Sequence, residues 1–198
     1  MHKQICALMM TLSLLAACGG GSKGDEAEQM ALDIRARYLS MAGCTAVLEI
    51  SADYGDRIFD CRVDLEHTTG ADTLLTIREP ELLKGVTARL RDGESLLEFD
   101  GVTVETGPLS REGLSPLDCV PFLLTEIREG FIAQWGLEEL EEEPCVRFTT
   151  ADPEGEVGQG TETVLWFERE NFALRRGELL VDGVTVLQCD VTDFHWKS

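Results

Sequence analysis

Two turn signals constrain the fold of this chain more than any other feature of its sequence. Asp-Gly occurs at 100–101 and again at 182–183, and both copies begin the string Asp-Gly-Val-Thr-Val. Apolar and polar residues alternate before and after each turn. Asp-Gly between alternating runs is a strong signal for a two-residue β-hairpin. The sequence therefore predicts antiparallel β-sheet, with the same turn used twice.

Hairpin pairing predicts which residues face one another. Counting outward from the two Asp-Gly turns pairs Phe99 with Val102, Leu97 with Val104, Val181 with Val184, and Leu179 with Val186. A further turn around Tyr54-Gly55 pairs Ala46 with Val63, Leu48 with Cys61, and Ile50 with Phe59. Each hairpin is then apolar on one face and polar or charged on the other. Such a sheet must cover its apolar face.

The first segment available to cover that face is an N-terminal helix. Residues 25–41 place Met30, Ile34 and Tyr38 at every fourth position, which is the spacing of one helical stripe. Acidic residues lead this segment, as suits the positive end of a helix dipole. Gly43 is placed to cap its end.

A second helical segment is expected between the two halves of the chain. Ser115 is a candidate N-cap, with Pro116 at the first helical position. Pro121 is then expected to restart or kink the helix, and Gly130 to end it.

Further strands are expected near residues 72–78, 85–91, 131–140, 145–150, 161–168 and 172–180. We therefore predict an α+β fold in residues 25–198, formed as a single domain. Its curled antiparallel β-sheet of roughly ten strands makes an open half-barrel. The N-terminal helix and the central helical segment cover the concave face.

The first 24 residues are predicted to direct the chain to the cell envelope. Residues 1–17 have a short basic start and an apolar run that is typical of a secretory signal and too short to cross a bilayer. The run ends in Leu-Ala-Ala-Cys, which resembles the bacterial lipobox, so Cys18 is expected to carry a diacylglyceryl group with acyl chains such as palmitate. Residues 18–24 then form a glycine-rich, flexible tether. These features predict an extracytoplasmic lipoprotein on the inner or the outer membrane.

The charge of the chain excludes one class of partner. With 17 Lys and Arg against 37 Asp and Glu, the net charge is −20. A nucleic-acid-binding protein needs a basic surface, so we expect no nucleic-acid partner. A basic surface for docking onto anionic lipid is lacking for the same reason.

Cysteine and histidine residues give no recognisable site. Five cysteines follow Cys18: Cys44, Cys61, Cys119, Cys145 and Cys189. Buried free thiols are the simplest interpretation, and disulfide pairing among them stays open. His67 and His195 are expected to be exposed, and neither zinc-binding nor catalytic motifs occur in the sequence. We therefore predict no cofactor, no metal and no enzymatic activity.

The order of these features resembles the bacterial lipoprotein-sorting family, the LolA/LolB-like half-barrels. The matching stretches are the hairpin between Cys44 and Leu65, the strand end Ile77-Arg78-Glu79-Pro80, the helical segment after Gly113-Leu114-Ser115-Pro116, and the meander from Leu165 to Gly183. The resemblance implies a hydrophobic cavity between barrel and helices that shields acyl chains. The soluble carrier of that family has no lipid anchor, whereas Cys18 predicts one here, which favours a receptor-like or unrelated envelope role.

Six apolar residues are the candidates to line such a cavity: Phe122, Leu123, Ile127, Phe131, Trp135 and Trp166. If they do, the chain binds a lipid or another lipophilic group without chemistry, and the helix around Phe122–Ile127 acts as a movable lid. If the same residues fill the core instead, the chain is a structural or interaction lipoprotein. Its acidic surface would then bind an envelope protein or a wall component. The sequence leaves both interpretations open.

Overall fold

The computed structural model describes residues 23–198 apart from 54, 92–93, 100, 106–115 and 157. Its helices are α1 (Lys23–Ser40), the short 3₁₀ turn η1 (Glu81–Leu83) and α2 (Cys119–Glu129). Within the described residues, neither α-helix is long and apolar enough to cross a membrane.

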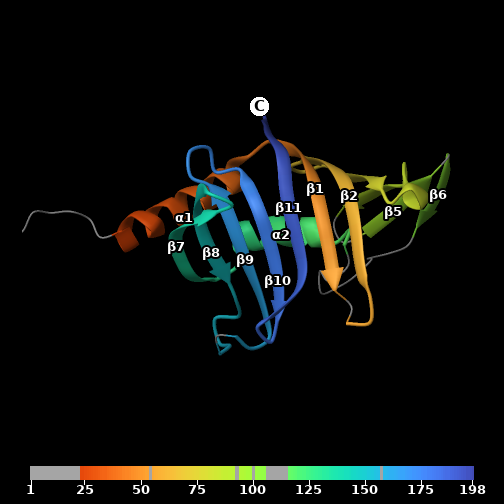
Figure 1. The fold of residues 1–198 in the computed structure, drawn as a ribbon. Helices are drawn as coiled ribbons and strands as arrows, with labels where there is room; N and C mark the ends of the chain where they lie inside the picture. The colour runs from red at the N-terminus through yellow and green to blue at the C-terminus, as the bar shows by residue number, and fades with distance from the viewer. Residues whose placement is uncertain (1–22, 54, 92–93, 100, 106–115, 157) are drawn as a thin grey trace, which may run out of the picture.

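The strands are β1 (Gly43–Asp53), β2 (Ile58–Thr68), β3 (Thr73–Glu79), β4 (Thr87–Arg91), β5 (Glu94–Phe99), β6 (Val102–Glu105), β7 (Ile132–Leu140), β8 (Glu143–Thr150), β9 (Thr161–Glu168), β10 (Leu174–Val181) and β11 (Val184–Lys197). They form one 11-stranded sheet in the order β6-β5-β4-β3-β2-β1-β11-β10-β9-β8-β7. Every pair is antiparallel. The first and last strands of the chain, β1 and β11, are neighbours in the middle of the sheet. Figure 1 shows the curved, open sheet with α2 lying across the strands behind it and α1 beside β7 and β8. The predicted half-barrel is confirmed.

The Asp-Gly hairpins pair almost as predicted. Phe99 faces Val102 and Leu97 faces Val104, and Val181 faces Val184. Leu179, however, faces Leu187 and not Val186, because the register shifts by one residue between Leu179 and Leu180. This bulge lies two residues from the turn, so counting from the turn alone misses it.

The register of the β1–β2 hairpin differs from the prediction by two residues. Leu48 faces Val63 where Cys61 was expected, because the connection takes up residues 54–57 and is longer than a tight turn. By the same shift, Ile50 faces Cys61 and Ala46 faces Leu65. An even shift leaves each side chain on its predicted face of the sheet, which is why the core residues were predicted correctly from a wrong register.

The stripe of α1 is broader than the predicted one. Ile34 and Tyr38 are fully buried as expected, and Ala27 and Ala31 join them, while Met30 packs at the margin of the core. Asp25 and Glu26 lie in the first turn, as predicted. Gly43 does not cap this helix: it opens β1, where an added Cβ would lie 2.3 Å from the carbonyl oxygen of His67.

The second helix begins later than predicted. It starts at Cys119 with Asp118 at the N-cap position, and Pro116 lies in the turn before it. Ser115 lies outside the described residues. Pro121 neither restarts nor breaks the helix, since it falls in the first turn, where a missing N–H costs no helical hydrogen bond. Gly130 ends the helix as predicted, with its N–H donating to the carbonyl of Glu126.

Candidate functional site

A single row of residues crosses the concave face of the sheet. Direct cross-strand partners connect, from β2 to β7, Cys61, Ile50, Cys189, Gly177, Leu165, Phe148 and Trp135. From Cys61 to Phe148 the side chains of this row are buried. The row therefore forms the floor on which any cavity of the half-barrel would be built.

Helix α2 lies along this row and covers it. Cys119, Leu123 and Ile127 are spaced four residues apart, so they share one face of the helix, and each is at least 98% buried. Leu123 rests on Gly177 so closely that an added Cβ on the glycine would lie 2.7 Å from its Cδ1. Glycine at this position lets helix and sheet approach each other.

The space left under α2 is very small. Its volume is about 20 Å³, and its walls come from α2 and from strands β1, β2, β10 and β11, including Leu48, Cys189, Val120 and Leu124. A volume of this size is roughly what one water molecule needs. The floor between α2 and strands β1 and β11 is therefore filled by the chain's own side chains, and an acyl chain enters there only if α2 moves.

Reciprocal hydrogen bonds tie the end of α2 to α1. Arg35 of α1 donates to the carbonyl oxygens of Ile127, at 3.2 Å, and Gly130, at 2.5 Å. Arg128 of α2 donates in return to the carbonyl oxygen of Tyr38, at 3.2 Å. Burial lowers the pKa of Arg35, against the opposing charge of Glu126. These bonds satisfy carbonyls that every helix end leaves without partners.

Arg128 also makes a buried contact with His67, which was expected to be exposed. The His67 side chain is only 8% exposed, with Nδ1 2.8 Å from the Thr73 hydroxyl and Nε2 3.0 Å from an Arg128 nitrogen. Burial, together with the charges of Arg128 and Lys197, lowers the pKa of His67 to about 4. His195, in contrast, is exposed as predicted. The sequence showed the histidine but not the helix that packs over it.

A second hollow, on the surface, lies between α1 and the start of β7. It has a volume of about 380 Å³ and is lined by Glu28, Ala31, Leu32, Arg35, Glu129, Gly130, Phe131, Ile132 and Trp135. Three large apolar side chains are exposed in it: Leu32 by 49%, Phe131 by 53% and Trp135 by 41%. We refer to this hollow as the α1–β7 groove. Because β7 is an outermost strand of the described sheet, the groove borders an open sheet edge.

The six predicted cavity residues separate into three places. Leu123 and Ile127 are on the face of α2 that packs on the sheet, and Phe122 is half-buried at the margin of the core. Phe131 and Trp135 lie in the α1–β7 groove. Trp166 is on the other face of the sheet, where its indole donates to Glu138 and the Arg147 guanidinium lies over its ring.

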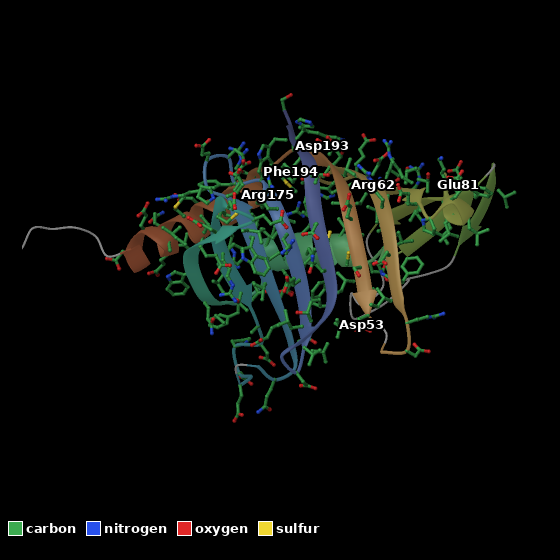
Figure 2. The ribbon with its side chains drawn as sticks, viewed as in Figure 1. Asp53, Arg62, Glu81, Arg175, Asp193 and Phe194 are labelled. Carbon is green, nitrogen blue, oxygen red and sulfur yellow. The ribbon has the colours of Figure 1, made fainter. Side chains whose placement is uncertain are left out.

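The convex face carries a row of charges that explains the position of Trp166. Its cross-strand partners are Arg62, Glu49, Asp190, Arg176, Trp166 and Arg147. Arg176 bridges Asp190 and Glu141. Figure 2 views the sheet from this side, with Arg62 labelled on β2. Trp166 is thus one aromatic residue in a charged row, and strand parity excludes it from the concave face.

All five cysteines after Cys18 are free thiols and buried. Burial raises the pKa of Cys44 to about 11 and that of Cys61 to about 12. Across the described part of the chain, no three His, Cys, Asp or Glu side chains come together in a way that could hold a metal ion.

This architecture was compared with known proteins in three ways. Neither a scan against protein-family models nor a search of curated proteins found a match. An uncharacterized conserved protein from Thermus thermophilus matches 86% of this chain and 88% of its own, with a TM-score of 0.53 at 12% identity. A putative outer membrane lipoprotein-sorting protein domain from Vibrio parahaemolyticus matches 87% of this chain and 94% of its own (TM-score 0.45, 12% identity).

A LolA superfamily protein from Nitrosomonas europaea also matches, over 87% of this chain and 94% of its own, with a TM-score of 0.42 at 11% identity. At such identities the likeness concerns the fold and carries over no ligand or residue role. An open antiparallel sheet curled around two helices is the architecture that the sequence predicted. The likeness that these comparisons support is one of fold, shared with the Thermus thermophilus protein.

Proposed function

We propose that this chain is a lipid-anchored extracytoplasmic lipoprotein that binds another envelope protein on its surface and performs no chemistry. The observation that carries the proposal is the close packing of α2 on β1 and β11, where the cavity between them has a volume of about 20 Å³. A half-barrel filled in this way is a rigid scaffold for surface contacts. The signal-like residues 1–17 and the lipobox-like sequence before Cys18 support the location and the anchor.

The α1–β7 groove is the surface best suited to a partner. The exposed side chains of Leu32, Phe131 and Trp135 gather in this one hollow, and exposed apolar patches mark interaction sites. Tryptophan in a pocket is also a frequent binding hot spot. Glu28 and Glu129 line the groove, Glu138 and Glu139 follow along β7, and the whole chain is strongly acidic. The partner segment that fits is therefore apolar with flanking basic residues.

Lipid binding under α2 is the second candidate function. It is favoured by one observation: the walls of the small cavity under α2 are apolar, with Ala46, Leu65, Leu174 and Val191 facing Leu123. Lifting α2 would expose an apolar floor, and an acyl chain covering it would gain about 25 cal/mol per Å² buried. The helix would first have to break its contacts with Gly177 and with Tyr38.

Binding of two probes to the mature lipoprotein in a phosphatidylcholine nanodisc distinguishes these functions. The first probe is a labelled peptide of alternating Leu and Lys, and the second is a fluorescent fatty acid. We expect the peptide to bind, and the affinity to fall at least about tenfold when Leu32 and Trp135 are both replaced by alanine. Added salt should weaken binding further, because the peptide is held partly by charge.

The matched control replaces Ile58 and Val184 by alanine. Both side chains are 64% exposed and lie at turns away from the groove, so peptide affinity should be unchanged. Equal loss in the control and the groove variant would mean that the peptide binds the acidic surface without using the groove. Fatty acid binding above that of empty nanodiscs, unaffected by the groove variant, would instead select the lipid function.

A further inference from the structure

The row beneath α2 brings two of the five cysteines together. Leu123 lies on Gly177, and Gly177 faces Cys189 directly across the β10–β11 pair. Cys119 precedes Leu123 by four residues, which is about 6 Å along the helix. Neighbouring strands are about 4.8 Å apart. Helix α2 runs across the strands (Figure 1), so a step of four residues along it is close to the distance between neighbouring strands. With Leu123 over Gly177 on β10, this step puts Cys119 over Cys189 on β11.

Contact between the two thiols agrees with this placement. The Cys119 and Cys189 side chains are each 1% exposed, and the Cys189 thiol is near enough to raise the pKa of Cys119. Cys119 also lies 3.1 Å from the carbonyl oxygen of Pro116, in the turn that leads into the helix. The small cavity under α2 borders Cys189, so there is room for the helix to settle closer to the sheet.

The other cysteines are less well placed, and Cys61, which also lies near Cys119, affects its pKa through charge alone while Cys189 makes a side-chain contact. Cys61 is in the same row as Cys189, but Ile50 lies between them, so their Cα atoms are two strand spacings or about 9.6 Å apart. A disulfide requires Cα atoms within roughly 7 Å. Cys44 lies six residues from the row along β1, opposite His67, and Cys145 projects from the other face of β8, opposite Glu138.

We propose that Cys119 and Cys189 form a disulfide bond when the protein is in an oxidising compartment, and that this bond fastens α2 to the sheet. Both S–H bonds are lost and one S–S bond forms, while the S–S bond of a small disulfide oxidant such as oxidised glutathione is cleaved. The two electrons and two protons leave with the oxidant as two thiols. The extracytoplasmic location proposed above would supply such an oxidant.

Because both thiols are buried in the folded protein, the disulfide is expected to form during folding. Hydrogen bonding to Cys189 and burial both raise the pKa of Cys119 well above its ordinary value. The thiolate is the form that attacks a disulfide, so the packed protein should react slowly. The bond is expected to form while α2 is still settling onto the sheet. Once formed, it would also prevent α2 from lifting, which bears on the second candidate function.

Thiol counting on the mature lipoprotein tests the inference. Cells are quenched with acid, and the lipoprotein is purified, denatured and alkylated, then digested and examined by mass spectrometry. We expect three alkylated cysteines, Cys44, Cys61 and Cys145, and one linked peptide that joins Cys119 to Cys189. After reduction all five should be alkylated. Five alkylated cysteines before reduction, or a Cys61–Cys189 link, would contradict the proposed bond in the cell.

Refolding in vitro separates the chemistry from the location. The reduced protein is refolded in a mixture of reduced and oxidised glutathione. If the Cys119–Cys189 link forms here but is missing from cells, the pairing holds and the oxidising location is wrong. If neither sample contains the link, the pairing itself is wrong. An alkylated Cys18 peptide would show separately that the anchor is missing.

Two variants connect the bond to the position of α2. In Cys145→Ser the link should persist, and reduction should lower the thermal midpoint by as much as in the unaltered protein, on the order of 10 °C. In Cys119→Ala no link can form, and reduction should leave the midpoint unchanged. A midpoint that falls equally on reduction of both variants would show that another cysteine pair is responsible.

Discussion

At the scale of single residues, His67 shows how a polar group is made part of a core. Its Nε2 faces Arg128, which can only donate a hydrogen bond, so Nε2 accepts and the proton is assigned to Nδ1, which donates to Thr73. A second proton would have to enter at Nε2, against the guanidinium. Lys197 adds positive charge nearby, and burial removes the water that would solvate an imidazolium. The neutral ring is thus the form that fits.

This arrangement predicts a loss of stability in acid. The unfolded histidine has a pKa of 6.5 and the folded one about 4, so between these values the unfolded chain binds more protons. Stability from this residue is complete above pH 6.5 and declines toward pH 4, by up to about 3 kcal/mol in all. Urea unfolding at pH 7.5 and at pH 5 measures the decline.

The variant His67→Gln provides the comparison, because glutamine keeps hydrogen-bonding groups but does not titrate in this range. It should be less stable at pH 7.5, yet lose less on going to pH 5. An identical decline in both proteins would show that the carboxylates alone are responsible and that His67 is not held in its neutral form.

At the scale of elements, the contact between α2 and β10 sets how closely the helix lies on the sheet. Three side chains spaced along one face of the helix lie on the row beneath it, and the closest approach is between Leu123 and Gly177. A methyl group at position 177 would overlap the end of the Leu123 side chain, which would have to shift. The absence of a Cβ therefore lets the Leu123 side chain pack directly on β10.

Replacing Gly177 by alanine should destabilise the protein by about 1–3 kcal/mol, because the new methyl group overlaps Leu123. Gly136→Ala in β7 is the matched control, since nothing lies within 4 Å of the added Cβ, and it should leave the free energy of unfolding nearly unchanged. Denaturant unfolding measures both.

A double variant checks that Leu123 is the cause. Leu123→Ala alone removes a buried side chain and should cost about 2–5 kcal/mol. Combined with Gly177→Ala, the added methyl group occupies part of the space, so the pair should cost less than the sum of the two single changes. Strict additivity would mean that the overlap is relieved elsewhere.

At the scale of the whole molecule, the two ends of the sheet differ in what they present. The β7 end carries the α1–β7 groove, beside the helix that leads back to the tether. The β5–β6 hairpin is at the far end of the sheet (Figure 1), with Phe99 and Val102 exposed at its tip. A chain anchored at Cys18 would therefore hold the groove nearer to the anchor than the hairpin. This geometry suits a partner that is itself at the membrane surface.

The anchor is tested by replacing Cys18 with serine and fractionating cells with Triton X-114. We expect the unaltered protein in the detergent phase, with a mature mass that includes the acyl chains, and the variant in the aqueous phase or unprocessed. Serine lacks the thiol to which the diacylglyceryl group is attached. Equal partitioning of the two proteins would show that Cys18 is not lipidated.

Much of this protein was determined by its sequence alone. Alternation and the two Asp-Gly turns were enough for an antiparallel sheet, and the spacing of Ile34 and Tyr38 was enough for a helix that buries one face. These features are local, so neighbouring residues contain the information. A register error of two residues did no harm, because strand parity depends only on even and odd positions.

Only the tertiary structure decided where α2 settles. Its contact with Gly177 joins residues more than 50 positions apart, and so does the burial of His67 under Arg128. The same packing separated Phe131 and Trp135 from Leu123 and placed Trp166 on the opposite face. The periodicity of apolar residues in the sequence indicates that a side chain faces the core. It does not indicate which distant element packs against that side chain. Whether the half-barrel is hollow or full depends on that second fact.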